Sequence, residues 1–324
     1  MASNEKDQKL LEGKIADVEV GTEADLDEVM KKYDRESNTR VWEGIPKLAV
    51  KVIAVAFSLY CMYVTLWSQA AQHVRLYNFL AMIVVLGYLT YPIKKGHVKV
   101  NSLPWYDIIF MLAGVLPLLY CSYVYDSVIV TQARRLTRNP LMCILAVLVF
   151  LSLVELCRRC VGLPILCVVG ALVLYTFLPF GAGIKYDKAI YDLFYTLNGL
   201  LGAPINVCAK YIVLFIIFGA FLERTGISNF FIDLANSIAG SASGGPAKVA
   251  VLSSALCGMV SGSSVGNTVT TGSITIPMMK KTGYKPEFAG AVEAAASTGG
   301  QIMPPIMGAA AFLMAEYVGE PFNY

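Results

Sequence analysis

The sequence predicts an all-α, polytopic membrane protein, and three observations carry this prediction. The chain has 324 residues, of which 56% are hydrophobic and only 15% are charged, whereas soluble domains carry roughly 25% charged residues. Its mean hydropathy is +0.59. Apolar runs recur along it, and a helix needs roughly 20 such residues to cross a bilayer. We therefore expect a lipid bilayer around most of the chain.

Charge and cysteine content exclude several other classes. The formal net charge of +3 is too small to indicate a nucleic-acid partner. Most of the eight cysteines stand singly inside apolar runs and are interpreted as small core residues. Cys157 and Cys160 have CxxC spacing, but no second pair and no nearby His completes a metal set. We expect no cofactor.

The chain is predicted to have three parts. Residues 1–40 are polar, mixed in charge and without the layout of a cleavable signal peptide, so they are interpreted as a cytoplasmic tail. Residues 41–182 hold the first transmembrane helices. Residues 183–324 hold the most unusual sequence, which we interpret as the core of the protein.

The apolar runs predict the membrane helices in order. Six runs are apolar enough for spans: Ile45–Trp67, Tyr77–Ile93, Ile108–Tyr125, Leu141–Leu156, Val161–Phe180 and Asn206–Leu222. Trp105 and Tyr106 are typical interfacial anchors before the third run. The segment Lys185–Leu201 carries charges at helical spacing and is predicted to be an interfacial or re-entrant helix.

Basic residues beside these runs predict a cytoplasmic N-terminus. If the spans alternate, most of them fall on one side: Lys31, Lys32, Arg35, Arg40, Lys94, Lys95, Lys99, Arg158 and Arg159. The exceptions lie in the loop 126–139, as Arg134, Arg135 and Arg138. This loop is either a true exception to the rule or a sign that one span is miscounted.

The first polar break in the apolar sequence predicts a re-entrant hairpin. Val249–Val260 is too short to span, and Ile274–Met279 follows after a segment rich in Gly, Ser, Thr and Asn. Backbone that leaves helical geometry at membrane depth must be buried in protein or line a cavity. The polar tip therefore predicts a binding site, formed by Ser261, Gly262, Ser263, Ser264, Gly266, Asn267, Thr270 and Thr271.

The second break predicts a discontinuous helix. Phe288–Ala296 begins a helix, the next five residues form helices poorly, and Pro304 and Pro305 remove two backbone donors. Facing a hairpin tip, such a helix can build a site near the bilayer midplane. Its predicted site residues are Ser297, Thr298, Gly299, Gly300 and Gln301.

Three features of these breaks have competing interpretations. Gly258, Gly262 and Gly266 recur every four residues, which is also the pattern of close helix packing in membranes. Glu293 is either a site residue or a carboxylate paired inside the bundle. Ser264 stands in a G-x-S-x-G pattern typical of hydrolase nucleophiles.

The hydrolase interpretation lacks a base. Nucleophilic Ser chemistry requires one, usually His, and the chain has only His73 and His97, both in early loops. We therefore do not expect an enzyme.

The segment Gly244–Glu316 (GGPAKVAVLSSALCGMVSGSSVGNTVTTGSITIPMMKKTGYKPEFAGAVEAAASTGGQIMPPIMGAAAFLMAE) resembles the large membrane subunit of tripartite ATP-independent periplasmic (TRAP) transporters. Together with FIIFGAFLERTG and VELCRRCVGLPI before it, it is most similar to the fused permeases of the TAXI branch. The resemblance covers roughly residues 154–324.

The resemblance implies a sodium-coupled importer of small organic anions in a bacterial or archaeal inner membrane. It implies a periplasmic TAXI-type binding protein as partner, with the first spans corresponding to a fused small subunit. Large subunits of this family contain two inverted repeats, so this chain is expected to hold only the first. Without the second permease repeat, here or on another chain, we expect no transport.

Helix breaks and resemblance together predict half of a sodium and anion site. The expected Na⁺ ligands are main-chain carbonyls of both breaks, with contributions from Ser263, Asn267, Thr271, Thr298 and Gly299. The alternative is a non-transporting membrane scaffold or receptor component in which the same glycines only pack helices.

Overall fold

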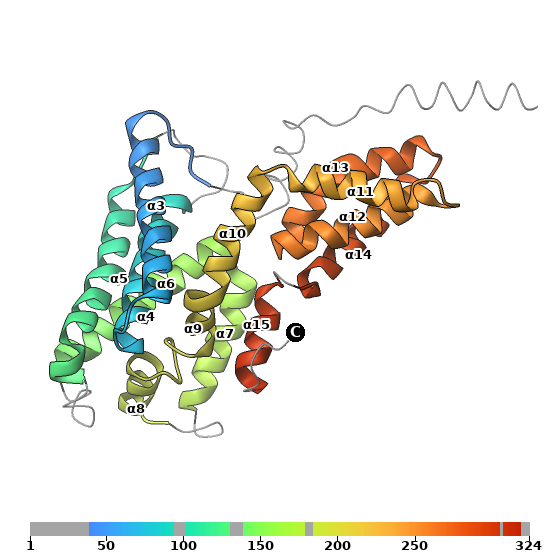
Figure 1. Ribbon diagram of the computed structural model, residues 1–324. Helices are drawn as coiled ribbons and strands as arrows, with labels where there is room; N and C mark the ends of the chain where they lie inside the picture. Colours follow the sequence, from blue (N-terminus) through green and yellow to red (C-terminus); the bar gives the residue numbers. More distant parts are fainter. Residues whose placement is uncertain (1–38, 94–100, 130–138, 179–183, 305–306, 319–324) are drawn as a thin grey trace, which may run out of the picture. The chain divides into compact units, whose positions relative to one another are not determined.

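The computed structural model describes residues 39–93, 101–129, 139–178, 184–304 and 307–318. Within these ranges every regular element is a helix and none is a strand, which confirms the all-α prediction (Figure 1). The described residues divide into two compact units, which we call the bundle unit (residues 39–210) and the hairpin unit (residues 211–318). The polar tail up to residue 38 lies outside the described residues, as do Lys94, Lys95, Lys99, Arg134, Arg135, Arg138 and Pro305.

The bundle unit is built on four long helices. They are α3 (Ile45–Leu66), α4 (Gln72–Thr90), α5 (Trp105–Val124) and α6 (Pro140–Cys160). Each is long and apolar enough to cross a membrane, as is the stretch Ala203–Leu222. These five stretches correspond to five of the six predicted spans, and the chain is a multi-pass membrane protein.

The remaining predicted span is shorter in the structure. Val161–Phe180 was expected to be one span, but α7 covers only Leu163–Phe177, beginning after Gly162 at a φ of 103°. Fifteen helical residues extend about 22 Å, which is less than the roughly 30 Å of a hydrocarbon core.

The prediction for Lys185–Leu201 is wrong in extent. Only α8 (Tyr186–Ile190) and a π-helical turn, η3 (Tyr191–Tyr195), form there. The chain then folds back, and Leu200 N donates to Leu193 O at 2.6 Å. Phe194 and Tyr195 are buried, so this segment packs into the bundle unit. Apolar spacing alone could not distinguish this packed turn from a surface helix.

In the core of the bundle unit α4 packs against α5 and α6. Buried tyrosine hydroxyls form hydrogen bonds between the elements of this core. Tyr88 Oη donates to Ser152 O at 2.8 Å, and Tyr77 Oη donates to Phe194 O at 3.1 Å. Both rings are fully buried. Because a buried hydroxyl without a partner is costly, these bonds fix which faces of the helices meet.

A buried ion network joins one end of α4, α5 and α6. Asp107, in the first turn of α5, is paired with Arg40 and with Arg159, whose Nη2 lies 2.6 Å from Asp107 Oδ1. Arg159 also contacts Glu155 at 2.9 Å, and its guanidinium lies 4.7 Å from the centre of the Tyr88 ring. Arg40 and Arg159, which the orientation argument counts as loop charges, are therefore also structural ion pairs.

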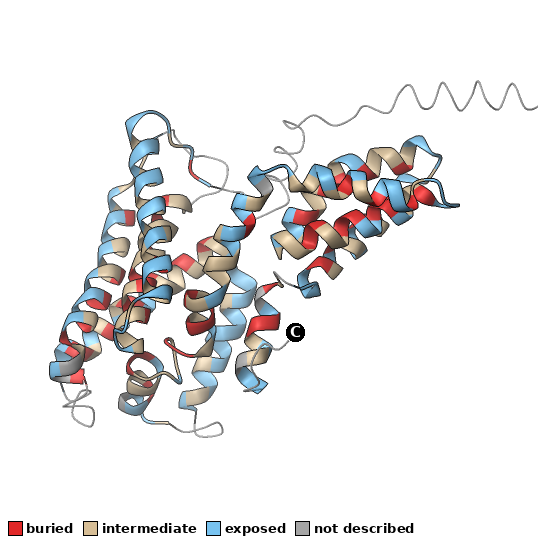
Figure 2. Ribbon diagram, in the orientation of Figure 1, coloured by how far each residue is buried: buried red, intermediate tan, exposed pale blue. Residues whose placement is uncertain are grey.

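Exposure differs sharply between helices (Figure 2). Only 6% of the apolar window of α3 is buried, against 44% of that of α4. The exposed side chains of α3 are mostly aliphatic or aromatic. In a membrane protein such a face suits lipid tails or another transmembrane helix.

The hairpin unit contains shorter helices. In chain order they are α10 (Val213–Arg224), α11 (Ile227–Ala239), α12 (Gly245–Ser261), α13 (Ser264–Lys281), α14 (Pro286–Gly299), the 3₁₀ turn η5 (Gly300–Ile302) and α15 (Ala309–Val318). Helices α11 to α14 pack against one another (Figure 1). Small residues such as Ala235, Ala250 and Ala289 occupy the helix contacts, which lets the backbones approach closely.

Candidate functional site

The hairpin tip is tighter than its sequence predicts. Helices α12 and α13 are joined by Gly262 and Ser263 alone. Gly262 adopts a φ of 60°, the left-handed conformation that ends many helices. Ser263 then caps α13, because its Oγ accepts from Gly266 N at 3.2 Å. The polar tip, predicted to reach from Ser261 to Thr271, is wrong in extent, since residues from Ser264 onward are helical.

The helix break after α14 is present, and both α14 and the turn that follows it pack against the hairpin. The α-helix continues through Gly299, the 3₁₀ turn follows, and α15 begins at Ala309. A Cβ atom added to Gly258 would lie 2.4 Å from Gly300 Cα, so only glycine permits this approach of α12 to η5. Gln301 Nε2 donates to Ser264 Oγ at 2.9 Å and connects the break to the start of α13.

A buried carboxylate surrounded by hydroxyls connects the hairpin to α14. Glu293 is fully buried and accepts hydrogen bonds from Thr271 and Thr275 of α13 and from Ser297 Oγ at 3.1 Å. Ser297 Oγ lies 3.0 Å from Ser254 Oγ on α12. Among the described residues no Lys or Arg pairs with Glu293. Gly272 makes room for it, since a Cβ there would lie 3.0 Å from Glu293 Cγ.

Asn267 joins this cluster through its nitrogen and leaves its oxygen unused. Nδ2 donates to Ser254 O at 2.7 Å and to Ser254 Oγ at 2.9 Å. Oδ1 is buried and has no hydrogen-bond partner among the described residues. A buried acceptor without a partner is uncommon, and it calls for an explanation such as a bound ion or water.

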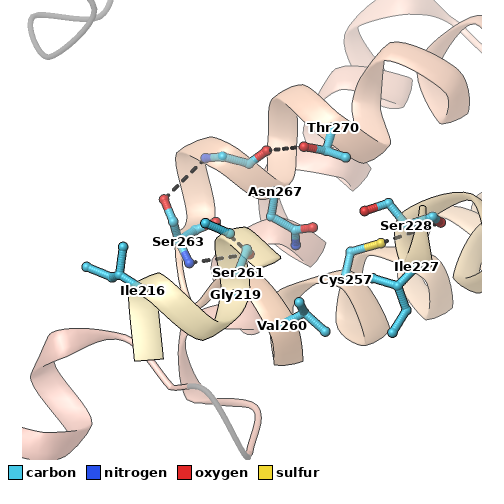
Figure 3. A pocket seen from close by; sticks show the side chains of 12 residues that line it. Ile216, Gly219, Ile227, Ser228, Cys257, Val260, Ser261, Ser263, Asn267 and Thr270 are labelled. Atoms are coloured by element: carbon cyan, nitrogen blue, oxygen red, sulfur yellow. Dashed lines mark hydrogen bonds between the residues drawn. The ribbon is translucent and has the colours of Figure 1, made fainter. Parts of the chain in front are cut away.

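Asn267 also lines a cavity of about 210 Å³ beside the hairpin tip (Figure 3). The cavity walls come from α10, α11, α12 and α13. Its polar lining comprises Ser228, Cys257, Ser261, Ser263, Asn267 and Thr270. Figure 3 shows the amide of Asn267 directed toward the space that Cys257 and Ser228 also border. Amide, hydroxyl and carbonyl oxygens are ligands that suit a hard cation.

The structure gathers most of the predicted site residues, but in three groups. Five lie on the cavity, namely Ser261, Ser263, Gly266, Asn267 and Thr270. Thr271 and Ser297 instead contact Glu293, while Gly262, Ser264, Gly300 and Gln301 form the contacts between the tip and the break.

Two predicted ligands are not gathered. Thr298 is exposed and its hydroxyl donates to Ala294 O within its own helix, and a Cβ on Gly299 would meet no atom within 4 Å.

Sequence reasoning missed Ser254 and Thr275 and left the role of Glu293 open. Ser254 and Thr275 lie inside segments that read as ordinary helix, and each is fully buried. The available signal was the hydroxyl spacing of Thr271 and Thr275, four residues apart and so on one face of a helix.

The recurrent glycines and the G-x-S-x-G pattern separate into distinct roles. Gly258 packs against Gly300, Gly262 makes the turn, and Gly266 borders the cavity. The hydroxyl of Ser264 accepts from the amide of Gln301, which is not a general base. The packing interpretation therefore applies to Gly258, whereas Gly266 lies on the cavity and its role in a binding site stays a prediction.

A protein-family model describes this part of the chain. The model of the tripartite ATP-independent periplasmic transporter DctM component matches residues 147–323, which is more than half of the chain. The chain belongs to this family. The family is described as a transporter component, and this membership favours the transport interpretation over the scaffold alternative.

Named relatives agree with this assignment. The chain is 37% identical over 91 residues to the C4-dicarboxylate TRAP transporter large permease protein DctM of Pseudomonas aeruginosa, covering 28% of the chain and 21% of that protein. It is 34% identical over 91 residues to the isethionate TRAP transporter permease protein DctMQ of Oleidesulfovibrio alaskensis, covering 28% and 14%. It is 26% identical over 161 residues to the 2,3-diketo-L-gulonate TRAP transporter large permease protein YiaN of Escherichia coli, covering 50% and 36%. The chain thus spans well under two thirds of these relatives' lengths, and no solved structure matches it.

Proposed function

We propose that this DctM-family chain forms part of the permease of a sodium-coupled secondary transporter in an inner membrane. One observation carries the proposal. Asn267 lines the cavity beside the hairpin tip, and its buried Oδ1 has no hydrogen-bond partner among the described residues. In a low-dielectric setting a cation stabilises such an acceptor, and irregular backbone supplies further carbonyl oxygens. The proposed Na⁺ ligands are Asn267 Oδ1 and oxygens of the tip residues Ser261 and Ser263.

The proposed cargo is a small organic anion delivered by a periplasmic binding protein of the TAXI type. The names of these relatives specify a C4-dicarboxylate, isethionate and 2,3-diketo-L-gulonate. All three are small anions. A sodium ion bound at the tip would offset the charge of such a substrate. Import is tested in cells that produce the chain with the transporter's other components, by sodium-dependent uptake of these three anions.

Sodium binding is tested on the full chain in detergent. We expect NaCl to raise the midpoint of thermal unfolding relative to KCl at equal ionic strength, since a ligand that binds only the folded state stabilises it, by about 2.7 kcal/mol at 100 times Kd. Asn267→Ala should remove this sodium effect. Thr298→Val is the matched control, because its hydroxyl bonds only within its own helix. Equal midpoints in sodium and potassium for the unmodified chain would count against the proposal.

A further inference from the structure

The orientation of the Asn267 amide is determined by its neighbours. Both hydrogens of Nδ2 are used, one on Ser254 O and one on Ser254 Oγ. Turning the amide by 180° would place Oδ1 against the Ser254 carbonyl oxygen, so that two acceptors would face each other at 2.7 Å. The oxygen is therefore the amide atom left without a hydrogen-bond partner among the described residues.

The second of these bonds depends on where the hydroxyl proton of Ser254 goes. Ser254 Oγ can accept from Asn267 only if its own proton points elsewhere, and Ser297 Oγ lies 3.0 Å away. Ser297 Oγ then accepts from Ser254 and donates its own proton to Glu293 Oε1 at 3.1 Å. The direction of every bond in this chain follows from having a carboxylate acceptor at its end.

We infer that Glu293 is a positioning residue for the cation site proposed above. Acting through Ser297 and Ser254, it holds the Asn267 amide with its oxygen available to the cavity. The inference rests on the proposed function, because it assigns Glu293 to the same sodium site. Glu293 itself contacts hydroxyl groups and does not line the cavity.

Replacing the carboxylate of Glu293 by an amide is expected to make the orientation of the Asn267 amide less strictly determined. In Glu293→Gln the new NH₂ group can donate to Ser297, whose proton can then turn toward Ser254 and reverse the chain. The proton of Ser254 would then no longer be held away from Asn267 Nδ2, and the orientation of the amide would be less strictly determined. Replacing a residue that orients a metal ligand typically lowers the metal affinity by about 10- to 100-fold.

The experiment measures the sodium concentration at half-maximal stabilisation, with NaCl as the probe and KCl as the ionic balance. The full chain, Glu293→Gln, Ser297→Ala and Thr275→Val are compared in detergent. Ser297→Ala breaks the chain without removing the charge. Thr275→Val is the matched control, because it also removes a hydroxyl from Glu293 but lies off the path to Asn267.

We expect Glu293→Gln and Ser297→Ala each to raise the sodium midpoint by about 10-fold, and Thr275→Val to leave it unchanged. All three changes should lower the unfolding temperature without sodium. Only the sodium midpoint, the sodium concentration at half-maximal stabilisation, therefore distinguishes a residue that positions Asn267 from one that only stabilises the fold. If the unmodified chain responds to sodium and both chain variants keep its midpoint, the inference is overturned. A shift in Thr275→Val equal to that in Ser297→Ala would overturn it too. An unmodified chain without any sodium response contradicts the proposed function instead.

Discussion

The bundle unit and the hairpin unit each bury a carboxylate completely, and they surround it with different chemistry. Asp107 lies between the guanidinium groups of Arg40 and Arg159. Glu293 accepts from the hydroxyls of Thr271, Thr275 and Ser297, and forms no ion pair within the described ranges. Both carboxylates accept hydrogen bonds from several neighbours, but in the described part of the chain only Asp107 is paired with cationic groups.

The two kinds of partner respond differently to a change of charge. A guanidinium group only donates hydrogen bonds and keeps its charge, so the oxygens of Asp107 that face Arg40 and Arg159 can only accept. A hydroxyl group donates and accepts, so the partners of Glu293 can rotate to suit a carboxylate or a neutral group. The first arrangement admits one pattern of hydrogen bonds, whereas the second can rearrange around the side chain that it surrounds.

Neutralising Asp107 is the most severe test of this contrast. Asp107→Asn leaves two buried guanidinium groups facing an amide that also donates, and losing one partner of a buried ion pair costs about 3–5 kcal/mol. We expect a loss of this size in the free energy of unfolding, measured by denaturant titration in detergent. The sodium midpoint should not change. A loss below that of Glu293→Gln would break the comparison.

The close approach of α12 and η5 comes next in expected effect. Gly258→Ala places a methyl group against Gly300 Cα, and overpacking of this kind costs about 1–3 kcal/mol. Gly299→Ala is the matched control, since a Cβ there meets no atom within 4 Å. Alanine also favours the helix, by about 1 kcal/mol over glycine. The two changes should therefore shift the unfolding midpoint in opposite directions. This result would show that the close approach at Gly258, and not the loss of a glycine as such, causes the destabilisation.

Neutralising Glu293 should cost less than either change. The hydroxyls can rotate toward Gln, so Glu293→Gln is expected to lose about 1 kcal/mol, the value of one ordinary hydrogen bond. The measurement is the same denaturant titration, performed without sodium. A loss as large as that of Asp107→Asn would mean that the hydroxyls do not rearrange. The two carboxylates would then respond alike to replacement by an amide.

The sequence was sufficient for the spans and for the positions of the two breaks. Long apolar runs predict α3 to α6, and Gly262 with Ser263 marks the turn, because these depend on residues adjacent in the chain. The extent of the polar tip was overestimated. Ser, Thr and Asn are poor helix formers in water, but in α13 the hydroxyls of Thr268 and Thr270 bond back to carbonyls four residues earlier.

The polar partners could not be predicted, since they meet only through tertiary packing. Ser254 and Ser297 are 43 residues apart and come together where α12 crosses α14. Arg159 next to Arg158 reads as a loop cation at the end of a span, yet its side chain has no exposed surface. Spacing predicts which residues share a helix face, but it does not predict which faces meet.

That neighbouring pair provides the smallest expected effect, within the ion network itself. The Arg158 side chain is 36% exposed and pairs with Glu155, at 2.8 Å and three residues away on the same helix. Exposed pairs contribute about 0.2–1 kcal/mol and are screened by salt. We expect Arg158→Gln to cost this little and to cost less at high potassium chloride concentration, whereas Arg159→Gln should be severe at any salt concentration because its partner Asp107 is buried. Equal losses for the two arginines would show that burial is not what distinguishes them, and the contrast between a fixed ion network and an adjustable hydroxyl cluster would lose its physical basis.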